Sequence, residues 1–248
     1  MDDGYLNFQR LMDAFMANDR QATRHETWAV VPVKEIVLAK QRLANFVPHR
    51  LRQELALAMF EDVLEALAAT PQLSGIAVVT LDPSATRIAL RRGAQVWTDG
   101  ARDGHTGAVT AAVRRLAANA STMLTMPGDI PLVSPSDIGK ILAAHPSAFA
   151  FTIVPAWDER GSNAIICSPA DAVPLRFGPD SFFPHLAAAR ACGLEPNVIQ
   201  NRAISLDIDE PAELTRFMSS RSNTRSWALL DQSRTEWERA CPAVLEAQ

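Results

Sequence analysis

Short apolar runs that alternate with longer helix-like segments constrain the fold of this chain more than any other feature. The runs have the length of strands and lie at residues 28–34, 75–80, 94–97, 122–126, 148–154, 163–168, 197–199 and 203–208. The intervening segments with helical character lie at 50–69, 83–92, 106–119, 135–144, 181–192 and 210–218. Continuous apolar runs predict strands that are covered on both faces. Strands alternating with such helices are typical of βαβ units, so the sequence predicts an α/β fold with a mainly parallel sheet.

The chain has 248 residues, which is enough for one sizeable core, and we expect one domain with an addition at each end. The domain spans residues 28–218. Residues 1–27 have apolar side chains at helical spacing and predict an amphipathic extension that docks on its own domain or on a partner subunit. Residues 219–248 indicate a linker followed by a helix that Pro242 interrupts. The sequence leaves open whether the chain forms a homodimer.

Composition argues against several classes of partner. The net charge of −4 argues against nonspecific binding to nucleic acid, which needs a basic surface. Cys167, Cys192 and Cys241 are widely spaced and form no metal-binding pair, which is typical of structural thiols in a reducing compartment. No apolar run approaches the roughly 18 residues that span a bilayer, and the charged first residues do not resemble a signal peptide. We therefore expect a cytoplasmic protein without a membrane partner.

The loop after the first expected strand carries a group of cations. Lys34, Lys40 and Arg42 lie close together in the sequence, and such side chains are suited to binding phosphates. A solvated basic loop is the alternative. This region has neither the GxxxxGK[ST] pattern of P-loop NTPases nor the GxGxxG pattern of dinucleotide-binding folds, which argues against both classes.

Acidic residues follow two other expected strands. Asp129 lies between Gly128 and Pro131 at the end of an apolar run, where it either organises a turn or holds a hard cation. Mg²⁺ is commonly bound by one or two carboxylates together with substrate phosphates. Asp207 and Asp209 are spaced to share one face of the last expected strand, although Asp209 is equally typical of a helix start.

Two further loops combine glycine with hydroxyl or imidazole side chains. Gly104, His105 and Thr106 precede an Ala-rich helix, whose N-terminus would either bind an anion or be capped by these side chains. The second group of residues lies at or just before the start of the expected strand at 163–168 and the expected helix at 181–192. These residues would form a neutral cradle for a phosphate or carboxylate, and they are Ser162, Asn163, Gly178 and Ser181. Ser181 is equally typical of an N-cap, and the nearby His185 is typical of a core histidine.

The order of these motifs resembles one family. The motifs are "VPVK…AKxRLA", "GDIPL", "D.RGSNA", "FG..SF..H" and "LDID.P.EL", and they cover about residues 28–218. In this order they are similar to the guanylyltransferases that activate a phosphorylated three-carbon acid in deazaflavin coenzyme biosynthesis, with 2-phospho-L-lactate or phosphoenolpyruvate as acceptor. The resemblance implies a three-layer, Rossmann-like nucleotidyltransferase sandwich related to glycosyltransferase type A domains.

The resemblance also implies roles for individual residues. Lys34 is expected to reach phosphates, with Lys40 and Arg42 as further catalytic cations. The expected Mg²⁺ ligands are Asp129, Asp207 and Asp209. Ser162 and Asn163 would contact the acid, Gly178 and Ser181 its phosphate, and the loop Gly104-His105-Thr106 would lie near the nucleotide. The implied partners are GTP and 2-phospholactate, phosphoenolpyruvate or 3-phosphoglycerate, and the implied product beside the nucleotidyl acid is pyrophosphate.

The sequence departs from the family pattern at two places. Ser162 replaces a threonine, which keeps the hydroxyl but removes a methyl group from the acid site. The loop that reads "DGHTGA" replaces a Gly-Leu-Asn sequence near the nucleotide. Two alternatives stay open: a nucleotidyltransferase of this fold that acts on a sugar phosphate or pterin cofactor, and a catalytically silent ligand-binding relative. The absence of glycine in "VPVKEIVLAKQRL" argues against the first.

Overall fold

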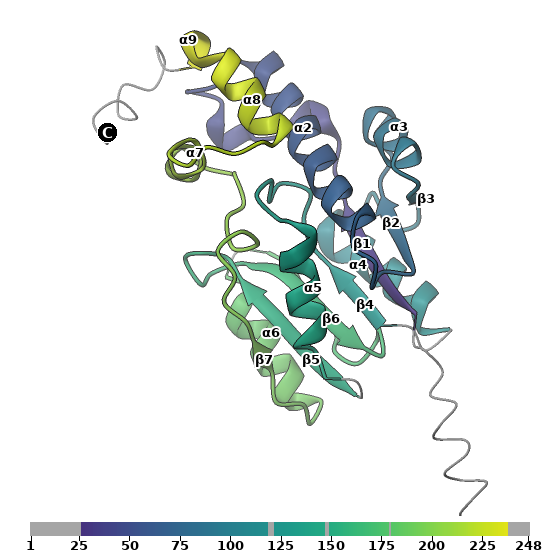
Figure 1. The fold of residues 1–248 in the computed structure, drawn as a ribbon. Helices are drawn as coiled ribbons and strands as arrows, with labels where there is room; N and C mark the ends of the chain where they lie inside the picture. Colours follow the sequence, from purple (N-terminus) through teal and green to yellow (C-terminus); the bar gives the residue numbers. More distant parts are fainter. Residues whose placement is uncertain (1–25, 119–121, 147–148, 179, 238–248) are drawn as a thin grey trace, which may run out of the picture.

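The computed structural model describes residues 26–118, 122–146, 149–178 and 180–237, and in these residues one seven-stranded sheet lies between helices (Figure 1). The strands are β1 (Thr27–Pro32), β2 (Gly75–Val79), β3 (Gln95–Trp97), β4 (Thr122–Thr125), β5 (Ala150–Pro155), β6 (Ser162–Ser168) and β7 (Asn197–Val198). The helices are α2 (His49–Ala68), α3 (Pro83–Arg91), α4 (Gly104–Ala117), α5 (Pro135–Ala143), α6 (Phe182–Ala191), α7 (Pro211–Met218), α8 (Arg225–Gln232) and α9 (Arg234–Trp237), with short 3-10 turns η1 (Ile36–Leu38) and η2 (Gln41–Leu43). The helix expected within residues 1–27 lies outside the described residues, as does Cys241.

The sheet is mixed and mainly parallel, as predicted. Its order is β3-β2-β1-β4-β6-β5-β7, and β6 alone runs antiparallel to its neighbours β4 and β5. The other paired strands run parallel. Because β6 is reversed, it begins at the edge of the sheet where β1 and β4 end. The first residues of β6 therefore lie beside the loops that follow β1 and β4.

Helices cover both faces of the sheet, which explains why the strands are continuously apolar. Along β1, Ala29 and Val31 face a buried cluster with α2, α3 and α5, whereas Val30 faces a cluster with α4 and α6. The three-layer α/β arrangement expected from the family resemblance is confirmed (Figure 1). No helix in the described part of the chain is both long and apolar enough to span a bilayer.

The predicted strand at residues 203–208 is wrong. This segment forms no ladder and lies between β7 and α7, although Ile204, Leu206 and Ile208 are buried. Ile204 packs in the cluster with α5, while the other two pack in a third cluster with α2 and α7. The apolar pattern therefore reflects burial beneath helices, and Asp207 and Asp209 do not share the face of a strand.

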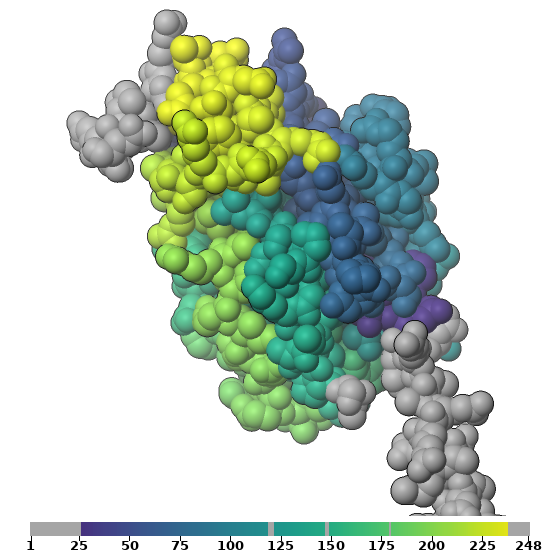
Figure 2. Space-filling model, viewed as in Figure 1, coloured from purple at the N-terminus to yellow at the C-terminus, as the bar shows by residue number. Residues whose placement is uncertain are grey.

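The segment after α7 packs on α2 and contributes to this third cluster. Leu230 of α8 and Trp237 of α9 are both buried, and the Trp237 indole Nε1 donates to the Leu230 carbonyl at 2.9 Å. Figure 2 shows this segment (yellow) against the α2 segment (blue). The single broken helix expected here begins at Arg225 and is divided at Ser233, so its first interruption precedes Pro242.

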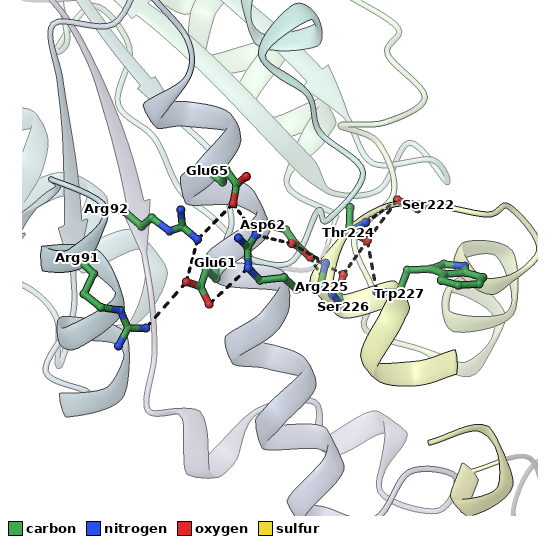
Figure 3. A network of polar contacts seen from close by, with 10 residues as sticks. All are labelled: Glu61, Asp62, Glu65, Arg91, Arg92, Ser222, Thr224, Arg225, Ser226 and Trp227. Atoms are coloured by element: carbon green, nitrogen blue, oxygen red, sulfur yellow. Dashed lines mark hydrogen bonds and ion pairs between the residues drawn. The ribbon is translucent and has the colours of Figure 1, made fainter. Parts of the chain in front are cut away.

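A carboxylate from α2 holds the N-terminus of α8. Asp62 is buried and accepts hydrogen bonds from the backbone amides of Arg225 at 2.9 Å and Ser226 at 3.0 Å, and from the Ser226 hydroxyl at 2.7 Å. A carboxylate in this position satisfies amides that lack partners within the helix and interacts favourably with the helix dipole. Figure 3 shows Arg92 and Arg225 between the neighbouring carboxylates Glu61 and Glu65.

We expect Asp62→Ala to lower the free energy of unfolding by about 2–3 kcal/mol, because it leaves buried donors of α8 without an acceptor. The neighbouring Glu61 supplies a matched control, since Glu61→Ala removes only partly exposed ion pairs and should cost less than about 1 kcal/mol. Urea unfolding monitored by circular dichroism would measure both values. Equal losses for the two variants would contradict the capping role of Asp62.

Candidate active site

A cavity of about 1120 Å³ lies at the edge of the sheet where β1 and β4 end and β6 begins. Every residue that the sequence analysis placed in a site contributes to its lining: Lys34, Lys40, Arg42, Gly104, His105, Thr106, Asp129, Ser162, Asn163, Gly178, Ser181, Asp207 and Asp209. In parallel α/β sheets this edge is where ligands bind. The structure therefore brings loops that are distant in the sequence into one cavity.

Lys40 joins two of the acidic loops. Its ammonium Nζ lies 2.5 Å from Asp129 Oδ2 and 2.8 Å from Asp209 Oδ1, and only 6% of the Lys40 side chain is exposed. Burial by itself favours the neutral amine, but the charges of Asp129 and Asp209 outweigh it and raise the pKa of Lys40 above its ordinary value. The same ammonium lowers the pKa of Asp209. Lys40 thus stays cationic and offsets part of the negative charge of the two carboxylates.

The backbone around Lys40 is held in an unusual conformation. Lys40 has φ of 54°, in the left-handed region that non-glycine residues seldom adopt. The buried Arg52 of α2 supports this turn, because its guanidinium donates to the carbonyls of Ala39, Lys40 and Val47. The turn therefore directs the Lys40 side chain inward, while Arg42 on η2 stays exposed and pairs loosely with Glu210 at 3.5 Å.

The third carboxylate has a different environment. Asp207 accepts a hydrogen bond from Asn163 Nδ2 at 3.0 Å, and the same amide donates to the Ile204 carbonyl. Burial, followed by the negative charge of Asp129, raises the pKa of Asp207 to about 7. The Ile208 amide donates to the Asp129 carbonyl at 3.1 Å, which fixes the Asp207–Asp209 segment beside the loop after β4.

Glu213 positions this acidic segment and was missed by the sequence analysis. Its Oε2 accepts from the backbone amides of Asp209 and Glu210, both at 2.7 Å, and its Oε1 accepts from the Trp157 indole at 3.2 Å. The helix start assigned to Asp209 is wrong by one residue, because Glu210 is the N-cap of α7. The signal for Glu213 was its place three residues after that N-cap, which is typical of a capping box.

The acidic residues fit a cation that is completed by other ligands. Asp129 Oδ1 is buried without a hydrogen-bond partner, and an oxygen in this state is suited to binding a cation. Among the described residues, however, no three His, Cys, Asp or Glu side chains converge as a complete metal-binding group. A hard cation such as Mg²⁺ needs only one or two carboxylates when substrate phosphates supply further oxygens. The predicted ligands fit that kind of site.

A second part of the cavity wall is a neutral cradle. Ser162 and Ser181 are buried, and the Ser181 hydroxyl donates to the Ser162 hydroxyl at 3.3 Å. Ser181 is the N-cap residue of α6, as one of the two interpretations predicted, but its hydroxyl makes no capping hydrogen bond to the helix. His185 is a buried core histidine, as predicted, and its Nδ1 lies 2.9 Å from Ser162 Oγ. A Cβ at Gly178 would meet nothing within 4 Å, which leaves space beside its backbone.

The first turn of α4, which holds the residues expected in a loop, contacts this cradle. Thr106 Oγ1 accepts from the Phe177 amide at 2.9 Å and donates to the Phe177 carbonyl at 3.1 Å, and the His105 ring stacks on Phe177 with centroids 4.1 Å apart. The capping interpretation of His105 and Thr106 is wrong, because Asp103 is the N-cap and α4 has no side-chain cap. Burial, with help from the charge of Lys34, lowers the pKa of His105 to about 4. Its buried Nε2 has no partner in the described structure.

Comparison with known proteins identifies relatives over most of the chain. The family described as "Guanylyl transferase CofC like" matches residues 27–239. A phosphoenolpyruvate guanylyltransferase of Roseiflexus castenholzii is 37% identical over 189 residues, which cover 76% of this chain and 86% of the relative. A protein of the same name from Conexibacter woesei is 34% identical over 192 residues, covering 76% and 85% of the two chains.

Solved structures show the same fold. A crystal structure from Desulfovibrio desulfuricans G20, named as a nucleotide-diphospho-sugar transferase, superposes with a TM-score of 0.68 at 19% identity and covers 86% of this chain and 97% of that one. A 4-diphosphocytidyl-2C-methyl-D-erythritol synthase gives a TM-score of 0.54 at 14% identity, with 78% and 97% covered. The family match over most of the chain, the identity to curated relatives and this shared fold lead to one conclusion: the chain belongs to the CofC-like guanylyl transferase family and is a nucleotidyltransferase.

Proposed function

We propose that the protein transfers GMP from GTP to the phosphate of a small phosphorylated three-carbon acid and releases pyrophosphate, as a step of deazaflavin coenzyme biosynthesis. One observation carries the proposal: an acidic group suited to a cation and a neutral cradle suited to an acid lie in one cavity at the carboxyl edge of the sheet. The relatives named as phosphoenolpyruvate guanylyltransferases make phosphoenolpyruvate the first candidate acceptor. 2-Phospholactate and 3-phosphoglycerate share its carboxylate and phosphate.

The two walls of the cavity suggest a division between the substrates. We assign the acid and its phosphate to Ser162, Asn163, Gly178 and Ser181, which offer hydroxyl, amide and backbone donors. The loop Gly104-His105-Thr106 opens α4, whose unpaired N-terminal amides favour an anion such as a nucleotide phosphate. Lys34 is exposed at the end of β1 and lines the cavity without a hydrogen bond or ion pair to another described residue, so we assign it to the phosphates.

The proposed reaction is a displacement at the α-phosphorus of GTP. An oxygen of the acid's phosphate forms a bond to that phosphorus as the bond to the bridging oxygen of pyrophosphate breaks. The attacking phosphate is already anionic, so no strong general base is needed, and catalysis depends on positioning and charge neutralisation. Bound Mg²⁺, held by Asp129 with Asp207 or Asp209, would supply part of that neutralisation. Lys40 keeps Asp129 and Asp209 beside each other, and Lys34 and Arg42 add positive charge at the rim.

Pyrophosphate release in the presence of GTP, Mg²⁺ and each of the three acids separately tests the substrate assignment. We expect the highest kcat/KM with phosphoenolpyruvate. The relatives of this protein are named phosphoenolpyruvate guanylyltransferases, and the cradle provides donors for both the carboxylate and the phosphate. The control replaces GTP by CTP and the acid by a sugar phosphate. Release with the control pair and none with GTP and any of the acids would contradict the proposal.

We expect Asp129→Asn to lower kcat by at least about 100-fold, because the amide removes a negative charge from the cation site while keeping the shape of the side chain. Steady-state pyrophosphate release measures the loss, and circular dichroism checks that the fold is intact. Asp171→Asn is a matched control, since Asp171 is exposed and does not line the site cavity. A near-normal kcat for Asp129→Asn would exclude the metal role.

We expect Lys40→Met to lower the free energy of unfolding by about 1–3 kcal/mol, because it leaves two partly exposed carboxylates without their cation. Mg²⁺ should then raise the Tm of Lys40→Met more than that of the wild type, since a bound cation replaces the lost ammonium and ligand binding stabilises the folded state. Arg42→Met is the control, because the exposed Arg42–Glu210 pair should contribute less than about 1 kcal/mol. Scanning calorimetry with and without Mg²⁺ measures these shifts, and equal Mg²⁺ effects on all three proteins would contradict the counter-ion role of Lys40.

A further inference from the structure

We infer that His185 is a positioning residue that makes the Ser162 hydroxyl a dedicated hydrogen-bond donor to the anionic acceptor substrate. The inference deepens the proposed function and rests on it. It begins with the place of His185 on α6, where the residue is 1% exposed and its Nδ1 lies 2.9 Å from the hydroxyl of Ser162, the first residue of β6. His185 itself does not line the cavity, whereas Ser162 does.

The hydrogen bonds of His185 determine which ring nitrogen carries its proton. The backbone amide of Arg176 points its N–H at Nε2, with a nitrogen-to-nitrogen distance of 3.0 Å. A backbone N–H only donates, so Nε2 must accept with its lone pair. Burial lowers the pKa of His185 to about 4, which keeps the ring neutral at physiological pH. A neutral ring that accepts at Nε2 carries its proton on Nδ1.

The Nδ1–H group then donates to Ser162. Ser162 Oγ lies 2.9 Å from Nδ1 and also receives the Ser181 hydroxyl proton at 3.3 Å. A serine oxygen has two lone pairs, so these two bonds use its whole capacity as an acceptor. The hydroxyl proton of Ser162 is left over, and no described protein atom accepts it. Because Ser162 lines the cavity, this proton is available to a bound substrate.

This arrangement removes an ambiguity that a serine hydroxyl otherwise has. A free hydroxyl rotates and either donates or accepts, so part of its interaction with an anion is lost to orientations that point a lone pair at it. Here both lone pairs are occupied, and only the donor is directed to the ligand. Hydrogen bonds to charged acceptors are stronger than those between neutral groups. The cradle therefore favours an acceptor oxygen of a carboxylate or phosphate over a hydroxyl donor.

The ring is also fixed in its plane by neighbouring groups. Phe177 contacts it edge-on with centroids 5.0 Å apart, and Phe177 is in turn held by its two hydrogen bonds with Thr106. Contacts with residues 176–177 thus fix the orientation of the His185 ring, and the ring in turn fixes the orientation of the Ser162 hydroxyl. If the His185 ring only filled space in the core, its hydrogen bonds with the Arg176 amide and the Ser162 hydroxyl would not be needed.

Nitrogen NMR of the unmodified protein labelled with ¹⁵N-histidine tests the hydrogen-bonding step without any substrate. Long-range proton–nitrogen correlation spectra between pH 6 and pH 8 should show His185 with a protonated Nδ1 and an unprotonated Nε2. His185→Gln identifies the signal by its loss. A proton on Nε2, or on both nitrogens, overturns the inference.

Four variants test the functional step: Ser162→Ala, His185→Gln, His185→Asn and the double variant Ser162→Ala/His185→Gln. The glutamine amide can still accept from the Arg176 amide but no longer donates to Ser162, whereas the asparagine amide keeps a donor near the Nδ1 position. We expect Ser162→Ala and His185→Gln each to raise the KM for the acid about tenfold and to leave the KM for GTP unchanged. His185→Asn should restore most of the acid affinity.

The double variant separates a positioning role from a structural one. If His185 acts through the Ser162 hydroxyl, the double variant should have the same KM for the acid as Ser162→Ala alone. Multiplying effects, or an equal increase in the KM for GTP, would overturn the inference, as would a loss of acid affinity in His185→Asn as large as in His185→Gln. Assays are run below the Tm of every variant, so that unfolding does not contribute. If the proposed function itself is wrong, the result is different, because the wild type then turns over none of the acids.

Discussion

The ion pairs of Lys40 with Asp129 and Asp209 connect the segments on which the rest of the site depends. The three residues come from the loop after β1, the loop after β4 and the segment before α7, so one ammonium links parts of the chain that are far apart in the sequence. Neighbouring carboxylates that are partly withdrawn from water repel each other and are costly to desolvate, and the buried Lys40 ammonium between them offsets part of both costs. The strained φ of Lys40 is consistent with this constraint, because backbone strain persists where the surrounding structure requires it.

The reversal of β6 complements this link. If β6 ran parallel to β4, its last residues rather than its first would lie at the cavity, and Ser162 and Asn163 would lie at the opposite edge of the sheet. Antiparallel pairing of β6 with β4 and β5 places both residues beside Asp129 and Asp207. Asn163 then joins the two walls, because its side chain at the cradle donates to the Asp207 carboxylate. The acidic wall and the neutral wall are thus parts of one hydrogen-bonded structure.

The sequence could predict most strands and the loops that meet, but not how their side chains pair. Apolar runs with helices between them identify buried strands, and the carboxyl-edge rule then brings the loops together. The apolar run at 203–208 was wrongly predicted to be a strand, because apolar residues buried beneath helices have the same sequence pattern as a buried strand. Pairings such as Lys40 with Asp209 or Ser162 with His185 depend on contacts across many intervening residues, and a single sequence carries no signal for them. Only Glu213 had a local signal, its spacing from the N-cap of α7.

The two walls handle charge in different ways, and this difference bears on how the acceptor is selected. The acidic wall has carboxylates compensated by Lys40, whereas His105 and His185 near the cradle both have pKa values of about 4 and are neutral. In the proposed function the cradle would bind an anion through oriented hydroxyl and backbone dipoles whose direction does not change near neutral pH. Fixed dipoles discriminate through the positions of the acceptor oxygens, while a mobile cation tolerates many positions. Ser162, where the family resemblance implies a threonine, keeps such a donor and changes only the space beside it, so under the proposed function discrimination among three-carbon acids at this cradle would depend on shape.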